Sequence, residues 1–339
     1  MYNCGHMPLA PFLPRPSALL PLTLLALGLT AMGAEAQPNL SVQPGTAKPG
    51  DPILVTVRGV DSAPSGTLAG HTLHFFESAG AWQALTGLPV EQAVGRIDVK
   101  VEGPHTRAGE QVKLVGTLDV VEPGFPDRQL KVAGKFIKPP ESVKAHIAED
   151  RAAFASAFSQ AFGPLRFERN FAWPRQDRIT APFGDRRSFN GKLQSQHFGT
   201  DIDGNMGDPI YAANDGEVVM TRECYASGNT VIVSHGGGLY TTYFHMSHFD
   251  VKPGDKVKQG QKLGLVGKTG RVTGPHLHWG VKVDGFWVDG LTLLKLDFFG
   301  NPEPRVAAAS GGSGQPAPAP APAASTDESN AAATSKVTP

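Results

Sequence analysis

Turn-forming residues recur at short intervals along this chain, and this punctuation constrains the fold more than any other feature. The sequence holds 40 glycines and 29 prolines among 339 residues. Between them lie short runs rich in Val, Ile and Thr, for example 53–57, 112–115 and 230–233. Such runs, bounded by Gly, Pro and Asp, are typical of β-strands joined by tight turns. The sequence therefore predicts a mainly β protein rather than a helix bundle, and its length suits two domains plus tails.

Residues 1–36 are predicted to be a signal peptide. Arg15 provides a positive charge, and an almost wholly apolar run from Leu19 to Ala31 leads to the small residues of Ala34-Glu35-Ala36. The apolar run is about a dozen residues, shorter than the roughly 20 that a membrane-spanning helix needs. An uncleaved membrane anchor is the alternative. We expect an exported mature chain, periplasmic or secreted, with no transmembrane segment.

Charge and cysteine content limit which binding partners and which catalytic chemistry the chain is expected to have. The formal net charge is 0 at pH 7, so the chain has no basic footprint for nucleic acid and no polybasic signal for anionic lipid. Cys4 would leave with the signal peptide, and the mature chain would then keep Cys224 alone, without an intramolecular disulfide. We expect Cys224 to be a small buried residue rather than a catalytic thiol. The sequence names no protein partner.

Three further regions follow from changes in pattern. Residues 37–140 alternate short extended runs with turn signals, which is typical of an antiparallel β-sandwich. Residues 141–165 are predicted to form a helical linker that packs between the two halves, because apolar residues recur there at mostly helical intervals. Residues 301–339, rich in Ala and Pro, cannot bury a core and are expected to be disordered. The apolar residues of the linker are Val143, Ile147, Phe154, Ala157, Phe158 and Phe162.

Polar residues in the second half, 166–300, have the spacing of metal ligands. His197 and Asp201 are four residues apart, and His276 and His278 are two apart. Residues two apart on a strand point to the same face, so His276 and His278 can enter one cleft together. A catalytic zinc site uses imidazole and carboxylate ligands, three in number, and keeps a position open for water. Two histidines and one aspartate meet that count and leave one histidine beside the metal.

His245 is a further candidate, at the end of the extended run 239–244. It could reach the same cleft, but the alternation of apolar and polar positions does not decide which face it takes. Each of these signals is weak alone, since an isolated H-x-H on a strand is more often structural or at the surface. The common helical zinc motif H-E-x-x-H is absent.

Longer stretches around these residues agree with a known family in order, spacing and flanking glycines. Residues 179–288 resemble the M23 (lysostaphin/LytM-type) zinc metallopeptidases. The region 37–140 has a weaker resemblance to the immunoglobulin-like β domains that precede some M23 domains. The matching stretches are Ala181–Arg186, His197–Asp201, Asp215–Val219, Gly228–His235, Tyr243–Ser247 and Gly264–His278.

This resemblance implies that His197, Asp201 and His278 bind Zn²⁺ and that His245 and His276 are the two catalytic histidines. His276 would be the general base, and His245 would orient the water or donate to the oxyanion. The implied activity is endopeptidase hydrolysis of peptide cross-links or stem peptides in bacterial peptidoglycan. Many family members read Phe-Glu after the H-x-H where this chain reads Trp279-Gly280, a departure that we expect to affect substrate contacts rather than activity.

Three other functions are considered. The first is an inactive M23-like protein that binds peptidoglycan or activates an amidase, but such relatives lose metal ligands and this sequence keeps them all. The second is a lipoyl- or biotinyl-type carrier, which residues 251–261 resemble, although a carrier has no use for the His/Asp set. The third is a structural zinc site, which usually has four ligands and is rich in cysteine.

Overall fold

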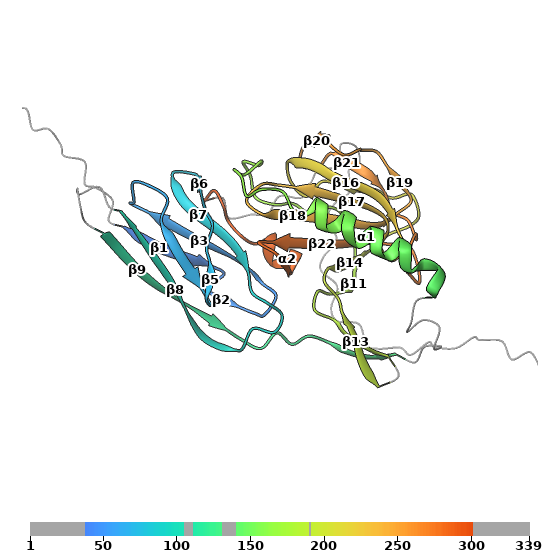
Figure 1. The fold of residues 1–339 in the computed structure, drawn as a ribbon, viewed down its shortest axis with the longest axis horizontal. Helices are drawn as coiled ribbons and strands as arrows, with labels where there is room; N and C mark the ends of the chain where they lie inside the picture. The colour runs from blue at the N-terminus through green and yellow to red at the C-terminus, as the bar shows by residue number, and fades with distance from the viewer. Residues whose placement is uncertain (1–37, 105–110, 131–139, 190, 301–339) are drawn as a thin grey trace, which may run out of the picture. The chain divides into compact units, whose positions relative to one another are not determined.

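The computed structural model describes residues 38–104, 111–130, 140–189 and 191–300, which are coloured in Figure 1. This part of the chain is mainly β, as predicted. The predicted signal peptide and the Ala/Pro-rich tail lie outside the described residues. No helix in the described part is long and apolar enough to cross a membrane.

Two sheets built from residues 39–120 share one hydrophobic core. Their strand orders are β1-β3-β7-β6 and β2-β9-β8-β4-β5. Ile53 and Val55 of the first sheet pack in one cluster with Val99 and Leu118 of the second, and burial of this apolar surface stabilises the pair of sheets. The immunoglobulin-like character of this region stays a prediction. The strands are β1 Asn39–Gln43, β2 Thr46–Ala47, β3 Pro52–Arg58, β4 Ser65–Leu68, β5 His71–Thr72, β6 Phe75–Ser78, β7 Ala81–Gly87, β8 Gly95–Pro104 and β9 Gln111–Val120.

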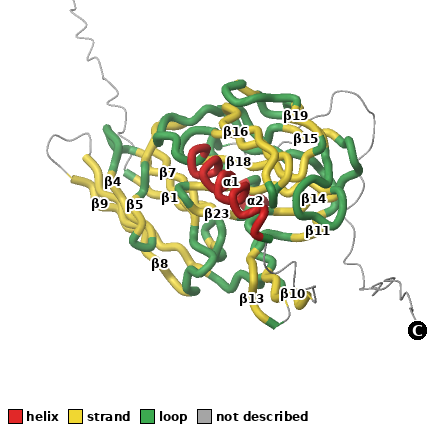
Figure 2. The backbone as a smooth tube through the Cα atoms, turned by 45° about the vertical axis from the view of Figure 1, so that its right-hand side comes forward, coloured by secondary structure: helices red, strands yellow, loops and turns green. Residues whose placement is uncertain are grey.

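A small sheet joins the segment after β9 to the second half. Strand β10 (Asp127–Leu130) pairs in parallel with β12 (Arg186–Phe189), and β12 pairs antiparallel with β13 (Lys192–Gln196). Figure 2 shows β10 and β13 in this small sheet. Residues well before the predicted peptidase region therefore contribute a strand beside the segment that leads to His197.

A helix lies within residues 141–165 and is shorter than that range, while its role as a linker stays a prediction. A 3₁₀ turn, η2 (Glu141–Val143), leads into α1 (Lys144–Ala157), which lies across the larger sheet in Figure 1. The rings of Phe154 and Phe158 contact Phe244 and Tyr240 of that sheet. The helix thus packs on the second half rather than between the halves, because its aromatic side chains contact aromatic rings of the larger sheet. Phe162, beyond the helix, is the predicted linker residue that contacts Phe76 of the first half.

The second half is built on an eight-stranded antiparallel sheet of order β11-β14-β22-β18-β17-β16-β20, with β23 on β22. A three-stranded sheet, β15-β21-β19, and the short helix α2 (Gly290–Leu293) complete it. The strands are β11 Ile179–Ala181, β14 Thr200–Asp203, β15 Pro209–Tyr211, β16 Gly216–Cys224, β17 Gly228–Ser234, β18 Leu239–Met246, β19 His248–Phe249, β20 Lys256–Val257, β21 Lys262–Leu265, β22 His276–Val283 and β23 Phe286–Val288.

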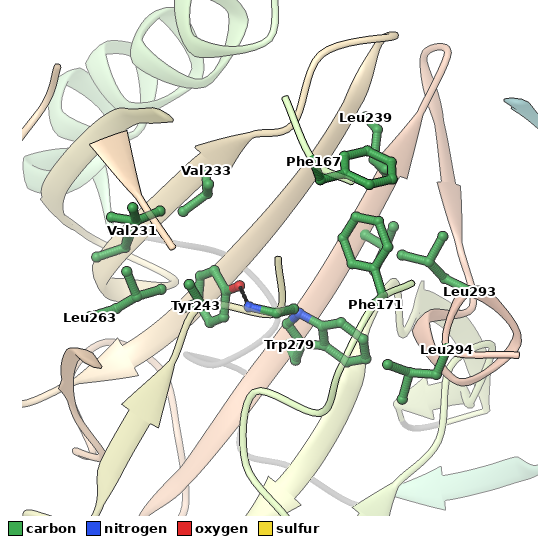
Figure 3. Close-up of a cluster of buried hydrophobic side chains, with 14 of the residues drawn as sticks. Phe167, Phe171, Val231, Val233, Leu239, Tyr243, Leu263, Trp279, Leu293 and Leu294 are labelled. Atoms are coloured by element: carbon green, nitrogen blue, oxygen red, sulfur yellow. Dashed lines mark hydrogen bonds between the residues drawn. The ribbon is translucent and has the colours of Figure 1, made fainter. Parts of the chain in front are cut away.

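Alternation along β22 separates the core from the candidate site. Leu277, Trp279 and Val281 are fully buried in the core drawn in Figure 3, so His276 and His278 point to the opposite face. Tyr243 of β18 lies in the same core, where its hydroxyl accepts a hydrogen bond from the Ala213 amide at 2.9 Å. Burial raises the pKa of Tyr243 to about 12.

The two positions of the departure at Trp279-Gly280 face opposite sides of β22, and its effect on substrate contacts stays a prediction. Trp279 is fully buried and faces away from the histidines. A Cβ at Gly280 would lie 2.5 Å from the Thr242 hydroxyl and 3.0 Å from the Trp287 ring. No side chain fits at position 280 without displacing these groups.

Candidate active site

Strand register brings the predicted ligands to one place. Strands β14 and β22 pair so that Asp201 lies opposite His278 and Asp203 opposite His276. His197 precedes β14, and its ring lies beside Asp201 and His278. A Cβ on Gly199 would lie 2.4 Å from His278 Nε2, so a glycine is required there for the His278 ring to take its place.

The side chains of His197, Asp201 and His278 converge on one small volume. His197 Nε2 and His278 Nδ1 lie 3.0 and 2.9 Å from the same oxygen, Asp201 Oδ1. The two nitrogens are 3.0 Å from each other, and the three groups form a candidate metal site. Two imidazole nitrogens and one carboxylate oxygen are a donor set that zinc accepts, so the residues present fit that ion.

Backbone carbonyls determine which ring nitrogens face the site. A carbonyl oxygen only accepts hydrogen bonds, so an imidazole nitrogen beside one must carry the hydrogen. In each of three histidines this nitrogen is Nδ1, which leaves Nε2 with a free lone pair. The bonds run from His197 to Pro182 O at 2.8 Å, from His245 to Thr269 O at 2.9 Å and from His276 to Gly274 O at 3.0 Å.

A β-bulge decides the face of His245, the point that the sequence left open. The register of β17 and β18 shifts between Asn229 and Val231, and His245 has φ +63°. Phe244 therefore stacks on the His278 ring at 4.9 Å, while the His245 ring lies 4.9 Å from that of His276. Both neighbours on β18 thus reach the site. A left-handed conformation in a residue other than glycine costs about 1–3 kcal/mol and is typical of functional sites.

Two imidazoles of the site favour the neutral form because they are buried. Burial lowers the pKa of His245 to about 3, and burial also lowers the pKa of His278. Burial opposes ionisation of Asp201, yet the adjacent His197 and His278 rings lower the pKa of its carboxyl well below the usual range. A single negative charge among imidazole lone pairs is a suitable environment for a cation.

Sequence reasoning missed Arg187. Its Nη2 lies 3.7 Å from Asp201 Oδ2, and its Nε donates a hydrogen bond to Asp185 Oδ2 at 3.2 Å. No spacing signal connects Arg187 with Asp201, because their contact depends on how the β12–β13 hairpin folds back before His197. Asp185 and Arg186 did lie in a stretch that matched the family.

Other histidines and the cysteine lie apart from the site. The His71 ring packs on Phe286 at 5.0 Å, and His74 Nε2 lies 4.0 Å from Asp284. His105 is outside the described residues. Cys224 is buried and unpaired, and burial raises the pKa of its thiol, as expected for a small core residue.

Comparison with known proteins places these residues in one family. The model of Peptidase family M23 matches residues 195–290, which contain the five histidine and aspartate candidates. Peptidoglycan DD-endopeptidase ShyA of Vibrio cholerae is 34% identical over 201 residues, 58% of this chain and 45% of its own. DD-carboxypeptidase/endopeptidase Mpg of Neisseria meningitidis is 37% identical over 108 residues, 32% of this chain and 25% of its own. This chain thus spans less than half the length of these curated relatives.

A solved structure is similar over a wider region. A Pseudomonas aeruginosa protein assigned to peptidase M23 superposes with a TM-score of 0.53 at 25% identity, covering 72% of this chain and 93% of that one. The likeness therefore extends beyond the residues that the family model matches. Together with the convergence of the five candidate residues in the matched region, these similarities show that residues 195–290 are a domain of peptidase family M23.

Proposed function

We propose that this protein is an exported, zinc-dependent endopeptidase that hydrolyses peptide cross-links or stem peptides of bacterial peptidoglycan, in the periplasm or after secretion. The observation that carries the proposal is the convergence of His197, Asp201 and His278 on one point, with His245 and His276 beside it. The substrate class is supported by the relatives named as peptidoglycan DD-endopeptidases.

In this proposal His197 Nε2, Asp201 Oδ1 and His278 Nδ1 hold Zn²⁺. Three protein ligands are the number of a catalytic zinc site with one position left for water. Bound zinc lowers the pKa of its water and polarises a carbonyl group. The hydrogen bond from His197 to Pro182 O orients the ring and keeps its Nε2 lone pair toward the metal position.

His276 is the general base in this mechanism. Its Nε2 carries a lone pair and lies 3.6 Å from Asp201 Oδ1. The side chain is 17% exposed, so it is only partly open to solvent. The Gly274 carbonyl holds the opposite nitrogen. His276 accepts the proton of the attacking water at Nε2 and can then deliver it to the leaving amine.

His245 orients the water by accepting a hydrogen bond. The sequence left two roles open, water orientation or donation to the oxyanion. With Nδ1–H engaged by Thr269 O and a pKa of about 3, His245 offers a lone pair at Nε2 and no hydrogen to donate there. These features support the first role.

The test is zinc content together with release of soluble peptides from purified peptidoglycan, for the mature chain and for His276→Ala. We expect about one zinc per chain in both proteins, as a single catalytic site requires, and peptide release from the wild type alone. His248→Ala is the matched control, because that side chain is 64% exposed and pairs with Asp250 rather than with the site. The masses of the products would identify the bond that is cut.

Two results would contradict the proposal. Full peptide release by His276→Ala would remove the assigned base. A wild-type protein that binds peptidoglycan but holds no zinc and releases nothing would instead be an inactive binding or amidase-activating member of the family.

A further inference from the structure

The two carboxylate oxygens of Asp201 have different surroundings. Oδ1 lies within 3.0 Å of His197 Nε2 and His278 Nδ1, the position of a metal-binding atom. Oδ2 faces Arg187, whose Nη2 is 3.7 Å away. A ligating carboxylate is commonly oriented by a partner of its other oxygen, and loss of such a partner weakens metal binding. Arg187 occupies that place here.

Arg187 is itself held by a buried carboxylate. Its Nε donates to Asp185 Oδ2 at 3.2 Å, and the Asp185 side chain is 0% exposed. A buried carboxylate needs compensation for its lost hydration. Within the described chain, Asp185 Oδ1 accepts no hydrogen bond, and its close cation is Arg128, whose Nε lies 3.1 Å away.

Arg128 comes from far outside the region that the M23 model matches. It lies on β10, where the register places it opposite Arg187 of β12. Two further contacts hold the segment 125–128 in place. The Arg186 amide donates a hydrogen bond to Pro126 O at 2.8 Å, and the Phe125 ring fills the space beside Gly184. A Cβ at Gly184, which has φ +82°, would lie 2.1 Å from that ring. The position of Arg128 is therefore defined by backbone pairing and packing as well as by charge.

We propose that Arg128 is a positioning residue for the metal site, acting through Asp185 and Arg187 on Asp201 Oδ2. The segment that follows the first two sheets would then set how tightly the catalytic domain holds its metal. The inference rests on the proposed function, because it takes His197, Asp201 and His278 as the zinc ligands. A purely structural contact would stabilise the fold without changing zinc affinity.

The experiment measures the dissociation constant for Zn²⁺ by competition with a chromophoric chelator, using the mature full-length chain. We expect Arg128→Gln to weaken zinc binding several-fold, by less than the factor of about 10–100 known for partners that contact a metal ligand directly. Arg128→Lys should recover part of the loss because it keeps the positive charge. Arg178→Gln is the matched control: it removes an exposed arginine that pairs with Asp203 on the same strand as Asp201, and it should leave zinc affinity unchanged.

A double variant tests the relay itself. Once Arg128 is replaced, Arg187→Gln should weaken zinc binding by a smaller factor than it does in the wild type, because Arg128 acts on Asp201 through Arg187. Arg128→Gln should unfold at a lower metal-free midpoint than Arg178→Gln, because it leaves buried Asp185 with one cation fewer, so zinc affinities are compared where both variants are folded. Wild-type zinc affinity in Arg128→Gln, an equal loss in Arg178→Gln, or fully additive losses would each overturn the relay.

These outcomes are separate from failure of the proposed function. A wild type that binds about one zinc and releases no peptide refutes the peptidase while the affinity comparison still stands. A wild type that releases peptides, with Arg128→Gln binding zinc equally well, refutes the relay alone.

Discussion

Single residues in this site are oriented by backbone groups rather than by charge partners. Three histidines give a hydrogen to a carbonyl through Nδ1, and each therefore presents a lone pair at Nε2. His278 is the exception, since its Nδ1 faces Asp201 and its Nε2 lies against Gly199. The absence of a side chain at position 199 is thus as much a part of the site as the ligands are.

We predict that Gly199→Ala weakens zinc binding about 10–100-fold, the range for changes that misorient a ligand. The new Cβ would lie 2.4 Å from His278 Nε2 and would displace that ring. Chelator competition measures the effect. Gly45→Ala, where a Cβ meets nothing within 4 Å, is the control, and equal affinity in the two variants would show that the His278 ring tolerates the intrusion.

At the scale of elements, β22 and β18 build the site in opposite ways. Regular alternation on β22 sends Trp279 into the core and the two histidines to the other face. On β18 a bulge and the left-handed His245 break the alternation, so that Phe244 and His245 both reach the site. The first arrangement is readable from sequence spacing, and the second is not.

We predict that Trp279→Phe lowers stability but spares function. The loss in unfolding free energy should be smaller than the roughly 3–5 kcal/mol expected for truncation of a buried Trp to Ala. Zinc content and KM for peptidoglycan fragments should stay at wild-type values, because the indole faces away from the histidines. Urea unfolding and steady-state kinetics check both parts. A raised KM with unchanged stability would instead assign Trp279 a role in substrate contact.

Across the whole described molecule, residues far apart in sequence meet near one buried and one half-buried carboxyl group, those of Asp51 and Asp289. Asp51 Oδ1 accepts from the Thr292 hydroxyl at 2.8 Å, and the Asp289 amide donates to Gly50 O at 2.7 Å. Burial, followed by the proximity of Asp51, raises the pKa of Asp289 to about 6. Burial also raises the pKa of Asp51. The protonated form of Asp289 is therefore the one that the folded state favours.

Stability should fall as the pH rises through this range. A carboxyl whose pKa is raised by folding contributes fully below its unfolded value, near 3.8, and loses that contribution as the pH passes about 6. Asp289→Asn imitates the protonated form and can still cap α2, where Asp289 now accepts from the Leu291 amide. We expect it to raise the free energy of unfolding by about 1–3 kcal/mol at pH 8 and to change it little at pH 4.

Urea denaturation at the two pH values measures this difference. The exposed Asp61→Asn in the first half serves as the control for loss of one negative charge. An equal gain at both pH values would mean that ionisation of Asp289 is not the cause.

The sequence by itself determined the mainly β architecture, family membership and the pairing of His276 with His278 on one face. These follow from turn chemistry and from an alternation of period two, which are local properties of the chain. Spacing alone could not place His245, end α1 at Ala157, or turn Trp279 into the core. Nor could it connect Arg128, Asp185 and Arg187 with Asp201. Those outcomes depend on the register between strands distant in sequence and on which rings and carboxylates become buried together, and only the tertiary structure decides them.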